Sequence, residues 1–404
     1  MPARSPFGSV GYRITRQRID KHPTIVGSGT ESNMEPGSSW TEPMRRILVN
    51  VLVVALACAL ALTVGEFVVR AIYKQQTVLF PRYHTDFRYG PYTLRGIRPN
   101  SEFWHTSVDG SWRFVTNERG FRDVRRFDYA KPADTLRVLS LGDSHTQGYE
   151  VRQEATFSAV LERYLNGRGV KAEVLNAGVS GFSTAEELAF LENEGYKYEP
   201  DVVVLGFYAN DFEDNLKAGL FMLDRGQLVE RKHEHIPGVG IQNVIYSVPG
   251  VRWLGEHSYF YSLLFNNVWE YFKVALSAHA AREAVEYAVA TRATQSDYEI
   301  ALGIALIARM QRYCTEHGIR LIVVDIPRKS KPYRFAESLP PAVLKALNEM
   351  HTEYLSSRSL LGDFDGSAEM HLLHGQDHIS EFTHALIGVE LGRQIVQGLQ
   401  TAAR

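Results

Sequence analysis

Residues 136–148 read LRVLSLGDSHTQG, and this stretch decides the fold class. The apolar run 136–141 predicts a short buried strand, and the small residues from Gly142 onward predict a tight turn directly after it. When a parallel strand ends in such a turn and a helix follows, the turn is presented to the ligand crevice at the edge of the sheet. The segment therefore predicts an α/β protein with Ser144 at its functional edge.

Strand and helix patterns alternate along the rest of the chain. Short segments with apolar character predict a strand at 172–175 and a buried strand at 319–326, and the unbroken apolar run at 201–208 predicts a buried central strand. Helical periodicity predicts four helices, at 156–167, 185–195, 296–317 and 381–399. Strands that alternate with helices are typical of a parallel sheet covered on its faces.

Two regions fall outside this alternation. Residues 73–134 are aromatic and turn-rich, and we interpret them as a lead-in of short strands and loops. Residues 217–294 are rich in aromatic side chains, and we expect a helical insertion there that packs a small core of its own. A substrate platform is the alternative interpretation, and both hold together if the insertion shapes the pocket.

Composition excludes several classes of protein. The chain has 404 residues, 45% hydrophobic and 22% charged, which is typical of a globular protein. Lys and Arg total 44 against 46 Asp and Glu, so the basic excess expected of a nucleic-acid-binding protein is missing. With two cysteines, Cys58 and Cys314, the chain is neither a disulfide scaffold nor a cysteine-rich zinc protein.

Residues 47–64 read ILVNVLVVALACALALTV and carry no charge. A helix of this length rises about 27 Å, close to the hydrocarbon thickness of a bilayer, and apolar residues resume at Phe67. We therefore predict a single transmembrane helix over 47–69. A buried core helix is one alternative, and a cleaved signal peptide with Ala59-Leu60-Ala61 as its processing site is another.

Residues 1–46 are rich in Pro, Gly and Ser and contain more basic than acidic side chains. Such a segment predicts a disordered tail, and its positive charge next to the apolar stretch favours the cytoplasmic side. The expected arrangement is an inner-membrane protein with a cytoplasmic N-terminus and everything from residue 70 onward outside the cytoplasm. Met34 and Met44 leave the true start of translation open.

Three more blocks join GDSHTQG at the ends of predicted elements. They are NAGVSG at 176–181, YAND at 208–211 and GQDHIS at 375–380. In order and placement the four blocks resemble the SGNH/GDSL family of serine hydrolases. The resemblance implies a flavodoxin-like three-layer αβα sandwich over 136–404 with an insertion at 217–294, preceded by an extracytoplasmic lead-in over 70–135.

The resemblance also implies roles for particular residues. Ser144 stands at the nucleophile position and His378 at that of the general base, which takes the serine proton and returns it to the leaving alcohol. The backbone N–H groups of Ser144 and Gly181 and the side-chain amide of Asn210 correspond to the donors that stabilise the oxyanion. No cofactor is implied.

The sequence departs from the family pattern twice. Tyr208 occupies a position that is usually glycine, which narrows the acyl pocket. The aspartate that orients the histidine usually stands two or three residues before it, where Gln376 and Gly375 are found. Asp377 is adjacent to His378 and reaches the imidazole only if the loop turns tightly.

The group that orients the imidazole therefore stays open at this point. Asp377 is our candidate for the third catalytic residue. Gln376, Asp365 and a backbone carbonyl are its substitutes. Ser–His chemistry survives a weak third member at a reduced rate.

We also considered a metal site in the same loop, formed by His371, His374, Asp377 and His378. Their spacing does not give a helix-face i, i+4 pair, and a metal would leave the first three blocks unexplained. No metal is therefore expected.

The sequence predicts a membrane-anchored serine esterase. Its expected substrates are small acyl esters, above all O-acetyl groups on envelope or secreted glycans. An O-acyltransferase would use the same residues with a sugar hydroxyl in place of water. A non-catalytic envelope binding protein is the alternative from another class, and the displaced aspartate motivates it. The sequence does not reveal the oligomeric state, and no nucleic-acid partner is expected.

Overall fold

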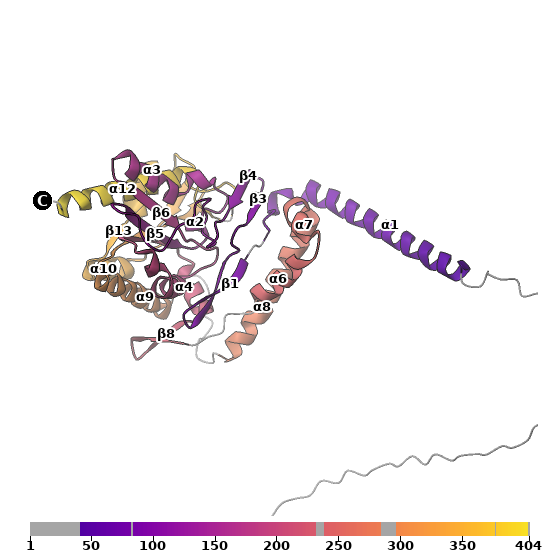
Figure 1. Ribbon diagram of the computed structural model, residues 1–404, viewed down its shortest axis with the longest axis horizontal. Coiled ribbons are helices and arrows are strands. Elements are labelled where there is room, and N and C mark those ends of the chain that lie inside the picture. Colours follow the sequence, from indigo (N-terminus) through magenta and orange to yellow (C-terminus); the bar gives the residue numbers. More distant parts are fainter. Residues whose placement is uncertain (1–40, 82–83, 232–237, 284–295, 376, 403–404) are drawn as a thin grey trace, which may run out of the picture. The chain divides into compact units, whose positions relative to one another are not determined.

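The computed structural model describes residues 41–81, 84–231, 238–283, 296–375 and 377–402 (Figure 1). The chain divides into two compact units between Cys58 and Ala59, inside the first helix, α1 (Thr41–Ile72). Apart from α1, the elements described below lie in the second unit, residues 59–404.

A five-stranded sheet with the strand order β13-β10-β7-β5-β6 forms the centre of this unit. Every neighbouring pair in it is parallel, which confirms the predicted α/β class. The strands are β5 (Leu136–Gly142), β6 (Ala172–Asn176), β7 (Val202–Phe207), β10 (Arg320–Asp325) and β13 (Glu353–Leu355).

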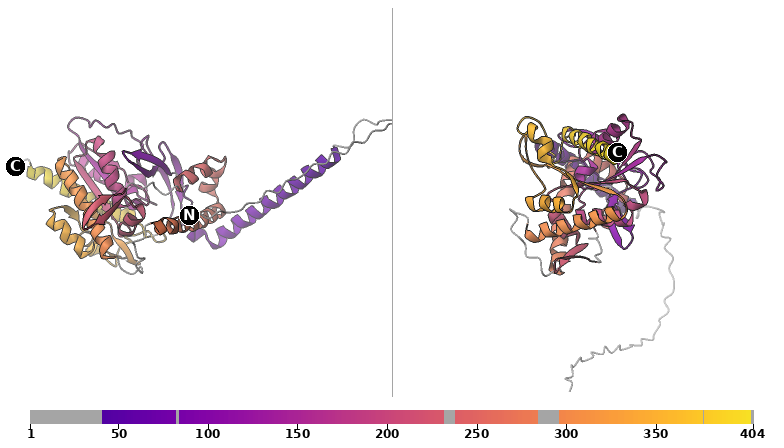
Figure 2. Two further views of the ribbon diagram at one scale, coloured as in Figure 1. Left: turned by 90° about the horizontal axis from the view of Figure 1, so that it is seen from below. Right: turned by 90° about the vertical axis from the view of Figure 1, so that its left-hand side faces the viewer.

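Helices cover both faces of the sheet, as the predicted three-layer sandwich requires (Figures 1 and 2). One face carries α3 (Phe157–Gly167) and α12 (Glu381–Ala402), which lie side by side. The other carries α4 (Thr184–Asn193), α5 (Asp211–Ala218), α9 (Asp297–Glu316) and α10 (Pro341–Glu349). Short helices α2 (Ser144–Gln147) and α11 (Ser357–Leu361) follow strand ends.

Alternating side chains of each strand feed two separate cores. Val138 packs with the α3 and α12 side chains, whereas its neighbour Leu139 faces α4 and α9. The same alternation separates Val204 from Leu205 in the central strand. Because successive strand residues point to opposite faces, an unbroken apolar run is the pattern that a sheet buried on both sides demands.

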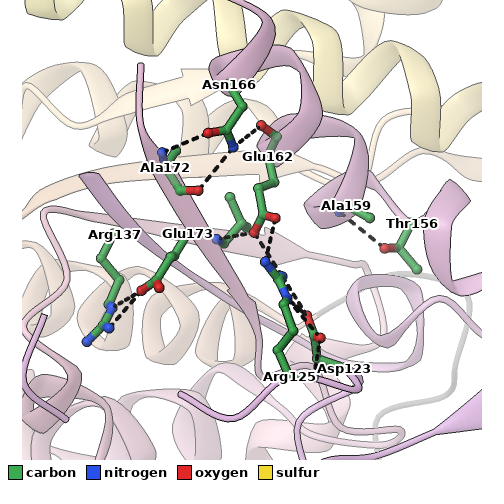
Figure 3. Close-up of polar contacts among 10 residues, drawn as sticks. Asp123, Arg125, Arg137, Thr156, Ala159, Glu162, Asn166, Ala172 and Glu173 are labelled. Carbon is green, nitrogen blue, oxygen red and sulfur yellow. Dashed lines mark hydrogen bonds and ion pairs between the residues drawn. The ribbon is translucent and has the colours of Figure 1, made fainter. Parts of the chain in front are cut away.

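The helix starts follow from local capping chemistry. The Thr156 side chain accepts the Ala159 N–H at 3.3 Å at the start of α3 (Figure 3). Before α9, the Ser296 side chain accepts the Glu299 N–H at 3.2 Å while the Glu299 carboxylate accepts the Ser296 N–H at 2.7 Å. These bonds satisfy N–H groups that have no acceptor within the helix.

The N-terminal helix is longer than the sequence predicted. It begins at Thr41, so residues 41–46 are helical where a disordered tail was expected, and it ends at Ile72. Its segment Glu42–Ile72 is long and apolar enough to cross a membrane. The helix includes these residues because no Pro or Gly separates Met44, Arg45 and Arg46 from the apolar run. The rest of the predicted tail, residues 1–40, lies outside the described residues.

The lead-in forms two antiparallel hairpins, as its turn-rich composition predicted. They consist of β1 (His84–Tyr89), β2 (Tyr92–Ile97), β3 (Glu102–Thr106) and β4 (Ser111–Val115). The loop after β4 is fixed to the sandwich by Arg125, which pairs with Glu162 of α3 at 2.7 Å and with Asp123 at 2.7 Å (Figure 3).

The insertion is helical in part but its core is shared. A hairpin of β8 (Phe221–Asp224) and β9 (Gln227–Glu230) joins the main core through Phe221. It is followed by α6 (Gly238–Ser247), α7 (Val251–His257) and α8 (Tyr259–Glu283). Tyr259 packs on Val69 of α1 and on Leu79 rather than in a separate core of the insertion.

Candidate active site

Ser144 lies on a sharp turn between β5 and α2. Asp143 is the N-cap of α2, and its carboxylate accepts the His145 N–H at 2.8 Å. Ser144 is the first residue of the helix, so its backbone N–H has no acceptor inside α2. The serine is half-buried at the carboxyl edge of the sheet, where the sequence predicted it.

Glycines let the backbone close this turn. A Cβ at Gly142 or at Gly206 of the adjacent strand would lie less than 3.0 Å from Thr146 Oγ1, and one at Gly178 would overlap the backbone of Gln147. Val179 also donates its N–H to the Gly142 carbonyl at 3.0 Å. The second sequence block therefore packs directly under the nucleophile turn.

The structure brings His378 to Ser144 across the sheet edge. The imidazole Nε2 lies 2.8 Å from Ser144 Oγ, which is hydrogen-bond distance. Burial lowers the pKa of His378 to about 3, so the ring is neutral at pH 7 and Nε2 is free to accept the serine proton.

Aromatic rings surround the imidazole of His378. Tyr149 stacks on it with ring centroids 4.4 Å apart, and His145 approaches it at 4.7 Å. Tyr208, the bulky residue at the family's usual glycine position, lies over His145 at 4.1 Å. The bulk of Tyr208 therefore packs against the ring beside the base.

The structure does not bring Asp377 to His378. Asp377 is exposed and has a left-handed backbone with φ of 65°. Its side chain diverges from that of its neighbour His378, so the carboxylate faces solvent. Asp365 forms an ion pair with Arg334 at 3.1 Å. Gln376 lies outside the described residues. Nδ1 of His378 has no hydrogen bond of good geometry with a described residue, although an interaction of the ring with the Gly375 backbone carbonyl raises the pKa of His378 against the larger effect of burial.

The candidate oxyanion donors follow neighbouring strand ends. Gly181 has φ of 78°, and the Arg95 guanidinium donates to its carbonyl at 2.6 Å, which fixes the orientation of this peptide. Asn210 precedes α5, and its amide donates to Asp214 at 2.9 Å and interacts with the carboxylate of Asp143. An amide has two N–H groups, and two carboxylates take them here, so binding an oxyanion requires the exchange of one of these contacts.

Arg122 connects the lead-in to the nucleophile turn. Its guanidinium is fully buried, lies over the Phe114 ring at 4.4 Å, and donates to the carbonyls of Gln147, Gly148 and Val151. Burial lowers the pKa of Arg122 to about 9. The sequence analysis missed this contact because an arginine in a loop gives no signal of which distant carbonyls it binds.

Buried carboxyl groups lie beneath Ser144. Burial raises the pKa of Asp143 to about 7, and it raises the pKa values of Glu187 and Asp211 well above the ordinary range. Their mutual repulsion acts in the same direction. Both carboxylate oxygens of Glu187 lack a hydrogen-bond partner among the described residues.

We expect Glu187→Gln to raise the thermal unfolding midpoint, and to raise it more as pH increases above about 4.5. The folded pKa of Glu187 lies above its unfolded value, so folding of the wild type weakens as pH rises through this window. The variant lacks this ionisation. Unfolding midpoints of the detergent-solubilised chain at pH 4.5, 6 and 7.5 test this, with the exposed Glu316→Gln as control. A constant difference across the series would contradict the assignment.

The four residues of the alternative metal site point to different partners. His371 Nε2 lies 3.0 Å from the Pro327 carbonyl, His374 Nδ1 lies 2.7 Å from Asp109, and Asp377 faces solvent. His378 contacts Ser144. Among the described residues, no group of three His, Cys, Asp or Glu side chains is arranged to hold a metal ion.

Several solved structures are similar to this chain at low identity. An esterase from Pseudoalteromonas is 13% identical with a TM-score of 0.37, covering 65% of this chain and 98% of that one. A lipase/acylhydrolase from Enterococcus faecalis is 15% identical with a TM-score of 0.36, covering 64% and 95%. An acetyl-xylooligosaccharide esterase from Geobacillus is 12% identical with a TM-score of 0.36, covering 66% and 96%.

A search of curated proteins found no relative of this chain. A comparison with family models matches residues 140–322, a range that includes Ser144, Gly181 and Asn210 and ends before His378. The matching model is that of the GDSL-like lipase/acylhydrolase family. Residues 140–322, which include the serine on the turn after β5, are thus similar to this family of ester-hydrolysing enzymes.

Proposed function

We propose that the protein is a membrane-anchored serine esterase that removes O-acyl groups through an acyl-enzyme on Ser144. The observation that carries the proposal is the 2.8 Å contact between Ser144 Oγ and Nε2 of the buried His378. A nucleophilic hydroxyl within hydrogen-bond reach of a neutral imidazole is the arrangement that acyl transfer needs.

The reaction has two halves. In the first, His378 accepts the Ser144 proton as Oγ attacks the ester carbonyl, and the tetrahedral intermediate then expels an alcohol that takes the proton from His378. In the second, His378 deprotonates a water molecule as it attacks the acyl-enzyme, and the imidazolium then returns this proton to Ser144 Oγ as the carboxylic acid leaves. The backbone N–H groups of Ser144 and Gly181 and the Asn210 amide stabilise the oxyanion in both halves.

The proposed substrate class rests on the aromatic residues around His378 and on the name of a similar structure. Tyr208 and Tyr149 crowd the base, which favours a small acyl group such as acetyl. One of the similar structures is named as an esterase of acetylated xylo-oligosaccharides. We therefore propose O-acetylated glycans of the envelope or of secreted material as substrates.

The anchoring proposal rests on α1. The lead-in begins shortly after its apolar segment ends, and Leu79 already pairs with Thr106 of β3. We propose that α1 spans the inner membrane, with the N-terminus in the cytoplasm and the hydrolase unit outside.

A fluorophosphonate probe tests the chemistry. We expect it to label the detergent-solubilised full chain once, at Ser144, and to label Ser144→Ala not at all. Peptide mapping by mass spectrometry locates the adduct. A matched control is Ser140→Ala, since Ser140 lies buried in the same strand away from the turn. An unlabelled but folded wild type would refute the enzymatic proposal and leave a binding protein.

A second measurement separates hydrolysis from transfer. With an acetyl donor and a glycan acceptor together, an esterase releases acetate at a rate that does not depend on the acceptor. Acetyl transfer to the glycan in preference to water would instead identify an acyltransferase.

A further inference from the structure

His378 has only one of the two contacts that a general base needs. Its Nε2 meets Ser144, but Nδ1 is buried with no hydrogen bond of good geometry to a described residue. During attack the ring becomes an imidazolium, and a buried cation without an acceptor is costly. Burial already holds the pKa of His378 far below its ordinary value. An anion near Nδ1 would stabilise this imidazolium more than the Gly375 carbonyl alone.

Glu150 is a buried carboxylate without an assigned role. It follows α2 and Tyr149, has a left-handed backbone with φ of 55°, and its side chain is fully buried. Neither carboxylate oxygen has a hydrogen bond of good geometry with a described residue. Nε2 of His105 in β3 lies 3.4 Å from Oε1. Burying an acid in this way is unfavourable unless it has a partner during the reaction.

Gly375 connects this carboxylate to the base. A Cβ at Gly375 would overlap Oε2 of Glu150, so the carboxylate lies against the backbone of the turn that carries the histidine. The Gly375 carbonyl accepts the backbone N–H of His378 at 2.7 Å. Only glycine at this position lets an acid approach the turn so closely.

The rings next to Glu150 complete the same wall of the site. Tyr149 stacks on the His378 imidazole at 4.4 Å, and His105 meets the Tyr149 ring edge-on at 4.3 Å. The two buried groups that lack well-formed hydrogen bonds, Glu150 and Nδ1 of His378, are thus bordered by the same residues. Asp377 is outside this wall, since it is exposed.

We propose that Glu150, held by His105, is the positioning residue that orients His378 and stabilises its protonated ring, in place of the acid missing at position 376. The inference rests on the proposed function. When the Ser144 proton moves to Nε2, the Nδ1–H group turns to Glu150 through a small shift of the turn at Gly375. Glu150 exchanges no proton in this step. Catalytic contacts of this kind commonly tighten only when substrate binds.

The test replaces Glu150 with glutamine, which keeps its size and removes its charge. For p-nitrophenyl acetate hydrolysis by the detergent-solubilised full chain, we expect kcat about 10²-fold lower with KM unchanged. Losing the anion also lowers the pKa of His378, so the acid limb of kcat/KM moves to lower pH. The other ionisable groups that act on this pair are His105, His145, His371, His384, Tyr149 and Arg122.

Controls distinguish positioning from a structural role. Glu154→Gln removes an exposed acid from the same loop and is expected to leave kcat unchanged. The thermal midpoint of Glu150→Gln should equal or exceed that of the wild type, because a buried charge has been removed. If Glu150→Gln does not fold, His105→Leu decides: it frees the carboxylate and is expected to lower kcat about tenfold.

The outcomes separate this inference from the proposed function. Wild-type kcat and pH profile in Glu150→Gln, or in His105→Leu where that variant decides, would overturn the role of Glu150. So would a large loss of kcat in Asp377→Asn or Gln376→Ala with none in Glu150→Gln. An active, unlabelled Ser144→Ala would instead overturn the esterase proposal itself.

Discussion

Replacing His378 with alanine is expected to reduce kcat for ester hydrolysis by roughly 10⁴- to 10⁶-fold. The imidazole is the only described group bonded to Ser144 Oγ, and a serine hydroxyl without a base is a poor nucleophile at neutral pH. KM should change little, because the proposed oxyanion donors and the substrate pocket remain. Initial rates with p-nitrophenyl acetate across a range of imidazole concentrations measure the loss.

Added imidazole should restore part of the His378→Ala activity, since the substitution leaves a cavity beside Ser144. His374→Ala is the matched control: His374 belongs to the same loop but is exposed and pairs with Asp109. A fall of less than tenfold in His378→Ala would mean that another group activates the serine. The neighbouring His145 would then be the first candidate.

Arg122→Met is expected to lower the free energy of unfolding by about 3–5 kcal/mol. The substitution keeps much of the side-chain volume but removes every hydrogen bond to the carbonyls of Gln147, Gly148 and Val151. Buried carbonyls without donors are costly, and these three belong to the segment that follows Ser144. Chemical denaturation of the detergent-solubilised chain gives the change.

Activity of Arg122→Met should fall as well, at temperatures where the protein is still folded, because the nucleophile turn loses its support. Arg126→Met provides the comparison, since Arg126 is 72% exposed and pairs with Asp128 on the surface. Its effect should stay within about 0.5 kcal/mol. Equal destabilisation by the two variants would show that Arg122 does not hold the turn.

The sheet could be predicted wherever a strand is mostly apolar. Four of its five strands gave such segments, and the helices between them gave clear periodicity. The fifth, β13, spans only Glu353–Leu355 at the sheet edge, and Glu353 and Tyr354 break the apolar pattern. A strand this short is defined by its pairing with β10 rather than by its own residues.

The residues of the site also divide into those that could be predicted from the sequence and those that could not. Ser144 and His378 belong to blocks with characteristic residues, so their approach could be expected from the order of the blocks. Arg122 and Glu150 could not, because each acts through contacts with segments far away in the chain. Asp377 is exposed and does not contact the imidazole, because adjacency in sequence says little about where two side chains point.

The crowding around Thr146 limits how this enzyme can diversify. Gly142, Gly206 and Gly178 have no room for even a methyl group, so the nucleophile elbow tolerates almost no substitution. Substitutions that change substrate preference are therefore expected outside these three glycines, where a side chain fits without moving the turn.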